Sequence, residues 1–321
     1  MTIPRSAAAL AVAATVAAVS AGCSAPAGSA SPTPGAGPTT TTAAASASAT
    51  PARTLDLTQP GAAKELVAEL MGAADALQAI MVTVTPTDAA VTVLRDGAAQ
   101  TWAWRDGSVQ QVPSDITYVD QRMFDPDDYD FSDVGALFRA AESVSGSRRG
   151  QSLQIVDYSG GQVSMSVSTV PESRAVFFHP DGTLLPTLDF SSAWGLGQGY
   201  ADVVGGRRVA SAIGFGSAIG VHLDGLQGAD GEVQRRQRTA RTPVIVTPRV
   251  ETTPLRPFDA ALVDPVVVWD VLARLKDEGS FTLDQTWSCI VDDRDATGHP
   301  LMHFTVGDRT FTTDLAGGVV P

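Results

Sequence analysis

Apolar residues recur three or four positions apart in three stretches of the chain, which is the spacing of a helix with one buried face. The stretches are 62–77, 133–141 and 265–275. Ser132 and Asp133 are suitable N-caps for the second stretch, and Asp264 followed by Pro265 is a typical start for the third. The pattern therefore predicts three helices.

Strand-like runs follow each predicted helix, and in several of them polar and apolar residues alternate. The runs are 80–85, 91–95 and 101–105, then 153–158, 163–168 and 174–178, then 281–291, 301–306 and 310–314. Asp-Gly pairs at 96–97, 106–107 and 181–182 are hairpin signals. One polar and one apolar face per sheet predicts an α+β fold of helix plus three-stranded antiparallel meander units, with helices covering one face of the sheet.

The domain organisation follows from these units. Two of them fill residues 54–187 and a third fills 260–321, whereas 188–259 fits no repeat. That insert is first glycine-rich and apolar, then basic and punctuated by proline, and an irregular segment of this kind is a natural place for a binding site. The helix-plus-meander unit resembles the small αβββ modules of bacterial envelope proteins, such as PepSY-like domains.

The N-terminus has the layout of an export signal. Arg5 precedes an apolar run, 7–19, that ends in Ser20-Ala21-Gly22-Cys23. This stretch resembles the lipobox of bacterial lipoproteins of the actinobacterial type, with Ser20 where leucine is usual. The resemblance implies a signal peptide over 1–22, a lipid on Cys23, and a location on the extracytoplasmic face of the cell membrane. The alternative is a plain secretory signal that happens to precede a cysteine.

Residues 23–53 follow the signal and consist almost entirely of Ala, Ser, Thr, Pro and Gly. Such a segment cannot bury enough apolar surface to fold, so we expect a disordered linker. Its root-mean-square span would be about 30 Å, which would hold the folded region away from the membrane. The run Thr39–Thr42 is either a site of O-linked sugar or part of a bare tether.

Composition excludes some functions. The formal net charge of the 321 residues is −13, which disfavours nucleic acid and anionic lipid as partners. Cys289 is the only cysteine besides Cys23, so no disulfide is expected to hold the fold. Cys289 lies in a strand-like run, and we expect it to act as a small buried hydrophobic residue.

The sequence contains little that indicates a metal site or a catalytic motif. Five aspartates crowd into nine residues, and they fit an acidic turn before a helix cap better than a calcium loop; they are Asp125, Asp127, Asp128, Asp130 and Asp133. The fragment 293–298 fits a hairpin turn better than a second calcium loop. His299 and His303 lie about 13 Å apart if they share a strand, so they cannot bind one ion. No nucleophile elbow, Ser-x-x-Lys motif or phosphate-binding lysine occurs. We therefore expect no metal, no cofactor and no enzyme activity.

The most apolar stretch after the signal is 209–223. It is either a buried helix or strand pair, or the wall of an apolar ligand patch formed by Ile213, Phe215 and Ile219. The arginines at 235, 236, 238 and 241 are either a solvated loop or an anionic contact near that patch. Trp102 and Trp104 alternate on one strand, where they either pack on a helix or form an exposed binding stripe.

These observations favour a membrane-anchored envelope lipoprotein with a non-catalytic binding domain. Its expected partners are the membrane, through the lipid at Cys23, and an envelope protein or polymer that the sequence does not identify. A carrier of a lipid or other apolar ligand is the first alternative, and it rests on 209–223. An exported hydrolase is the second, and a buried acid/base pair in a deep pocket would support it.

Overall fold

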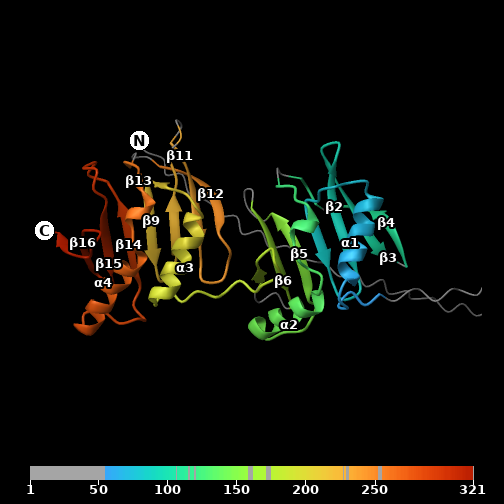
Figure 1. Cartoon of the computed structure of the whole chain (residues 1–321), viewed down its shortest axis with the longest axis horizontal. Coiled ribbons are helices and arrows are strands. Elements are labelled where there is room, and N and C mark those ends of the chain that lie inside the picture. Colours follow the sequence, from blue (N-terminus) through green and yellow to red (C-terminus); the bar gives the residue numbers. More distant parts are fainter. Residues whose placement is uncertain are drawn as a thin grey trace, which may run out of the picture. The chain divides into compact units, whose positions relative to one another are not determined.

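The computed structural model describes residues 55–320, except 106, 115, 119–120, 158–161, 171–174, 227, 229–230 and 252–254. Within these residues the chain is an α+β protein with antiparallel sheets, as the sequence predicts, and it has four α-helices where the sequence predicts three (Figure 1). The expected signal peptide, Cys23, the linker, Asp106, Tyr158 and Arg174 lie outside the described residues.

The first sheet has seven strands in the order β4-β3-β2-β1-β5-β6-β7, all antiparallel. Its elements in chain order are α1 (Ala62–Ala73), β1 (Met81–Val84), β2 (Ala89–Arg95), β3 (Ala98–Arg105), β4 (Ser108–Val112), the 3₁₀ turn η1 (Pro126–Asp128), α2 (Val134–Ser145), β5 (Ser152–Asp157), β6 (Val163–Ser168) and β7 (Val176–Phe178).

The second sheet has eight strands in the order β12-β11-β10-β9-β14-β15-β16-β17, also antiparallel. Its elements are α3 (Ala193–Val204), β9 (Ala212–Gly216), β10 (Gly220–Asp224), β11 (Glu232–Arg238), β12 (Ile245–Val250), the 3₁₀ turn η2 (Ala260–Leu262), α4 (Pro265–Asp277), β14 (Trp287–Asp292), β15 (Leu301–Val306), β16 (Arg309–Thr313) and β17 (Val319–Val320). A separate two-stranded ladder pairs β8 (Val209–Ala210) with β13 (Phe258–Asp259).

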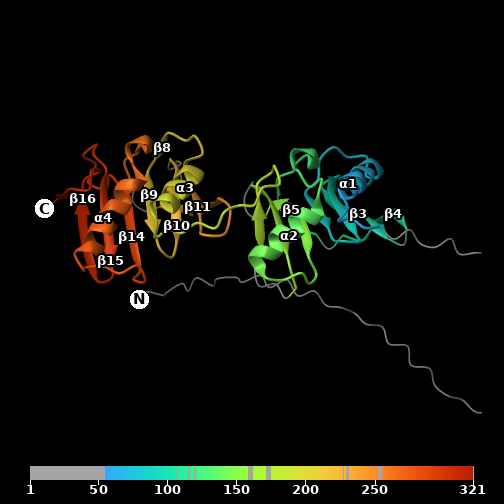
Figure 2. The same ribbon diagram turned by 60° about the horizontal axis from the view of Figure 1, so that its bottom comes forward.

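The two sheets share one order of elements. In each, a helix precedes a four-stranded meander, a second helix follows, and a second meander pairs its first strand with the first strand of the earlier one. Residues 188–259 therefore differ from the expected insert, because they supply α3 and half of the second sheet. The arrangement within each sheet can be followed in Figure 2.

Local sequence explains where the helices begin and end. The Asp133 carboxylate accepts a hydrogen bond from the amide of Ala136 at the start of α2, at 2.7 Å. Asp264 does the same for α4, where Pro265 occupies the first helical position. Gly146 and Gly205 follow α2 and α3 in the left-handed conformation, which glycine adopts without steric cost.

The hairpin predicted at Asp96-Gly97 is confirmed. Asp96 and Gly97 have φ values of 52° and 75°, and they join β2 to β3. Positive φ at both central residues is the geometry of a type I′ turn, which matches the twist of antiparallel strands.

Each sheet packs one face into its own hydrophobic core. In the first, Val82, Val91 and Ile155 from the strands meet Leu70 and Phe138 from the helices. In the second, the strand residues Ile213, Phe215, Val291 and Phe304 meet helix residues such as Leu196 and Val268. Cys289 is a buried free thiol in this second core, as expected.

The basic segment is structural rather than a solvated loop. Arg238 is fully buried on β11; it pairs with Asp202 of α3 at 3.1 Å and donates to the backbone carbonyls of Pro186, Thr239 and Thr242. Arg236 donates to the carbonyl of Val203 at 2.7 Å, where α3 ends. These contacts fix α3 against β11.

Candidate functional site

The second sheet carries polar groups on the side opposite its apolar core, and His222, Asp224 and Asp292 among them are buried. Ile213 and Phe215 of β9 point into the core, so the alternate residues Ala212 and Gly214 face the other side. On that side the neighbouring strands and the turn after β14 place a set of charged and imidazole groups. We call this set the histidine–aspartate face; its members are His222, Asp224, Arg235, Arg249, Asp292, Arg294 and His303.

Two rows of this face follow from the register. In one row, Ala212 pairs with Asp224 on one side and with Asp292 on the other. In the next row, Gly214 pairs with His222 on one side and with Ile290 on the other, and Ile290 pairs with His303. Since adjacent strands lie about 4.8 Å apart, the two aspartates flank β9 with about 10 Å between their backbones.

The side chain of Asp224 is only 4% exposed, and it forms ion pairs with two arginines. Arg235 binds both carboxylate oxygens at 2.7 Å, and Arg249 approaches one of them at 3.3 Å. Burial raises the pKa of Asp224, whereas His222 and Arg249 lower it. Arg249 also pairs with Glu251, so the rim of the site is charge-balanced at this end.

Asp292 has a similar environment on the other side of β9. Arg294 binds both of its oxygens at 2.8 Å, and the His303 Nε2 lies 3.5 Å from Asp292 Oδ1. The other ring nitrogen, Nδ1, is 3.2 Å from the hydroxyl of Thr312. Burial and then the charge of Arg294 lower the pKa of His303, which favours the neutral imidazole.

His222 differs from these paired groups. It is 3% exposed, and its Nδ1 is buried without a hydrogen-bond partner. Burial lowers its pKa, while Asp224 opposes that effect. A buried polar atom without a partner costs about 1–3 kcal/mol. Such an atom is expected where a ligand completes the hydrogen bonding.

The chemistry available on this face is recognition of a polar ligand. Arg235, Arg249 and Arg294 are donors at its rim, and their charges are matched by Asp224, Asp292 and Glu251. A ligand with many hydrogen-bonding groups and little net charge suits this balance.

A hydroxyl–imidazole–carboxylate chain runs through Thr312, His303 and Asp292. The same order of groups activates the nucleophile in hydrolases. Here the second step spans 3.5 Å, and the His303 Nε2 makes no hydrogen bond. The chain is therefore an incomplete relay in this structure.

The three residues of the expected apolar patch do not share a surface. Ile213 and Phe215 are fully buried in the second core, whereas Ile219 is 39% exposed in the turn between β9 and β10. The strands β9 and β10 of the apolar stretch form a buried hairpin, and its first two residues form β8. The expected lipidation site, Cys23, lies outside the described residues.

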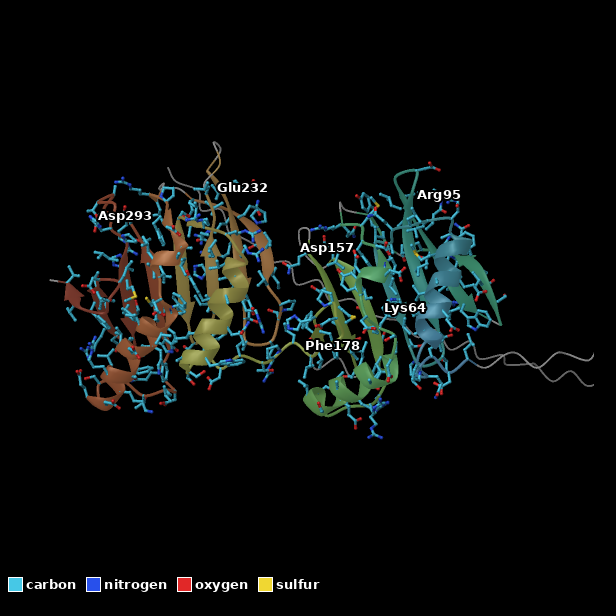
Figure 3. All side chains as sticks on the ribbon, in the orientation of Figure 1. Lys64, Arg95, Asp157, Phe178, Glu232 and Asp293 are labelled. Carbon is cyan, nitrogen blue, oxygen red and sulfur yellow. The ribbon has the colours of Figure 1, made fainter. Side chains whose placement is uncertain are left out.

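The acidic clusters act locally. Asp125 accepts a hydrogen bond from the amide of Asp127 at 2.9 Å, and Asp130 accepts from both the amide and the hydroxyl of Ser132. Asp293 accepts from the amides of Thr297 and Gly298 in a turn after β14 (Figure 3). Among the described residues, no three His, Cys, Asp or Glu side chains gather as a metal site.

Trp102 and Trp104 are partly buried and pack against the first core. Across the part of the chain that is described, no helix is both long and apolar enough to cross a membrane.

The sequence pairs His303 only with His299 and leaves His222 isolated, so it does not predict the face that His222 and His303 share with Asp224 and Asp292. One available signal was glycine inside a strand-like apolar run, since it marks a close approach by another group. Gly214 is such a residue, and the ring of His222 lies against it.

Comparison with known proteins adds no further assignment. No family model, no curated protein and no solved structure matches the chain.

Proposed function

We propose that the chain is a lipid-anchored binding protein on the extracytoplasmic face of the cell membrane. In this proposal Cys23 carries the lipid and residues 24–53 form the tether. The folded region is non-catalytic and recognises an envelope protein or polymer through the histidine–aspartate face. Support for the anchor comes from the lipobox-like sequence Ser20-Ala21-Gly22-Cys23.

The fold suits this role if helices cover one face of each repeated sheet and leave the opposite face for binding. Support comes from the second core, where Leu196 of α3 and Val268 of α4 join residues of the strands. In Figures 1 and 2, α3 and α4 both lie in front of the strands of this sheet. The groups left on the other side are those of the histidine–aspartate face.

The observation that carries the proposal is the buried Nδ1 of His222 without a hydrogen-bond partner. Folding alone gains nothing from this atom, since a phenylalanine ring would occupy similar space without the cost of an unsatisfied nitrogen. A ligand that hydrogen-bonds to His222 would remove that cost. The surrounding ion pairs would then orient the ligand by their fixed donors and acceptors.

The test uses the full chain with Cys23→Ser, so that it can be purified without the anchor. Co-sedimentation with insoluble cell-wall polymer and with detergent-solubilised envelope proteins immobilised on beads measures binding. We expect His222→Phe to reduce binding and His299→Phe, at an exposed position, to leave it unchanged. Equal binding by the His222→Phe chain would reject this face as the recognition surface.

Two alternatives have their own tests. Native mass spectrometry of the same Cys23→Ser chain, followed by solvent extraction, would detect a stoichiometric lipid and favour an apolar-ligand carrier. A hydrolase is favoured by the order Thr312–His303–Asp292, and covalent labelling of Thr312 by a fluorophosphonate would support it.

Fractionation of cells tests the anchor separately, because Cys23→Ser should release the protein from membranes.

A further inference from the structure

A groove runs along α1, which packs on the first sheet, whereas the histidine–aspartate face belongs to the second sheet. It lies between this helix and the segment 125–131, and its volume is about 300 Å³. Lys64, labelled on α1 in Figure 3, lies at its edge. Its Nζ is 3.4 Å from Asp127 Oδ1 and 5.9 Å from the centre of the Phe131 ring.

The floor of the groove is formed by small residues of α1. Ala68 and Gly72 lie one helical turn apart, and both are exposed. A Cβ on Gly72 would meet no atom within 4 Å, so packing within the protein does not require glycine there. Glycine inside a helix is about 1 kcal/mol less favourable than alanine. Its presence leaves room for another molecule to approach the helix closely.

The walls of the groove are apolar. Leu77 is 88% exposed beside it, and Met71 and Phe131 form its buried side. A single exposed leucine is ordinary on a protein surface. Here, however, it borders a hollow whose floor is formed by the small residues Ala68 and Gly72, a shape that can receive an apolar side chain of a partner.

The rim is acidic. Asp125 and Asp127 both line the groove, and Lys64 is the only lysine or arginine among the described lining residues. Glu65 and Glu69 are exposed on the same helix. Lys64 is already paired with Asp127, so the local excess of negative charge favours a partner that carries lysine or arginine.

We infer that this groove binds a basic amphipathic segment of a partner protein. Leucine-like side chains of the segment enter between Gly72 and Leu77, and its basic side chains meet Asp125 and Asp127. This mode is recognition of a helix in a groove, with anchors at helical spacing. The inference rests on the proposed role as an interaction protein, but it does not depend on the histidine–aspartate face.

The test uses the full Cys23→Ser chain and two labelled peptides of about 15 residues, a length at which isolated helices become populated. One peptide is an amphipathic helix of leucine and lysine, and the other has glutamate in place of lysine. Fluorescence anisotropy is expected to show salt-dependent binding of the lysine peptide and no binding of the glutamate peptide. NMR shifts should appear at 64–77 and 125–131.

Gly72→Leu adds a side chain at the groove, where its Cβ would meet no atom within 4 Å, and it should weaken binding of the lysine peptide about tenfold or more. Gly197→Leu is the matched control, because Gly197 is also helical and its added Cβ would meet nothing within 4 Å. Asp125→Asn retains an oxygen for the turn at η1, and it should weaken binding and reduce its salt dependence.

The inference is overturned if the lysine peptide does not bind, if its shifts fall outside the groove, or if Gly72→Leu binds as the unsubstituted chain does. His222→Phe should bind this peptide normally. If His222→Phe loses envelope binding but still binds the peptide, the two surfaces act independently. Failure of one proposal is then distinguishable from failure of the other.

Discussion

Gly214 and His222 share one space on the second sheet. A Cβ built on Gly214 would lie 1.9 Å from the Cε1 atom of His222, so the imidazole ring rests directly on the backbone of β9. The two residues are partners in the β9–β10 register. The position of His222 therefore depends on the absence of a side chain at 214.

Gly214→Ala should displace the His222 ring. Overpacking of this kind costs about 1–3 kcal/mol in the free energy of unfolding, and we expect a loss in that range together with reduced envelope binding. Urea denaturation measures the first effect and co-sedimentation the second. Gly197→Ala is the control: its Cβ meets nothing within 4 Å, and it should stabilise the chain by about 1 kcal/mol. Unchanged stability in Gly214→Ala would mean that the ring moves aside without cost.

His222→Phe should separate stability from binding. The substitution keeps a ring over Gly214 but removes a buried nitrogen that lacks a partner, so the free energy of unfolding should stay the same or rise by about 1 kcal/mol. Envelope binding should fall. His299→Phe, at an exposed position, should change stability by less than about 0.5 kcal/mol. A large loss of stability in His222→Phe would instead indicate that the imidazole holds the fold.

Stability should decrease as the pH falls through the ordinary range of histidine. The pKa values of His222 and His303 are lowered in the folded state, so below about pH 6.5 the unfolded chain binds protons that the folded chain does not. Asp224, whose pKa is raised, binds a proton more readily when folded and opposes this trend at lower pH. Denaturant titrations between about pH 7.5 and pH 5.5 measure the slope.

The His222→Phe chain provides the control for that pH dependence. It lacks one of the two histidines whose pKa is lowered by folding, so its free energy of unfolding should fall less over the same pH interval. An identical slope in the two chains would show that the imidazole of His222 takes up its proton equally well in the folded and unfolded states.

Parts of the fold that depend on local chemistry could be predicted from the sequence. Asp133 and Asp264 cap two helices that the spacing of apolar residues predicts, and Asp96-Gly97 forms the predicted hairpin turn. These features involve neighbours along the chain, so a short window contains all of their determinants.

The second sheet was harder to predict, because both faces of its central strands are buried. His222 and Asp224 alternate with Val221 and Leu223 on β10, yet all four are buried, which hides the usual polar and apolar sides. On β11, buried Arg238 occupies a position that faces the apolar core side. A binary pattern cannot indicate a strand whose core-facing residue is charged. The pairing across β9 that creates the candidate site is likewise invisible along the sequence.

Arg238 is fully buried and joins β11 to α3 and to the segments around Pro186 and Thr242. Arg238→Met removes a donor to the carbonyls of Pro186, Thr239 and Thr242 and leaves Asp202 without its cation. Removing one member of a buried ion pair costs about 3–5 kcal/mol, and we expect a loss of that size in urea denaturation.

Two further variants identify which contacts of Arg238 matter. Asp202→Asn keeps an oxygen acceptor and should cost only about 1 kcal/mol, because Arg238 would still bind the three carbonyls. Arg241→Met, at an exposed position on the same hairpin, should change stability by less than about 0.5 kcal/mol. If Asp202→Asn were as destabilising as Arg238→Met, the ion pair with Asp202 rather than the contacts to the three carbonyls would account for the stabilisation by Arg238.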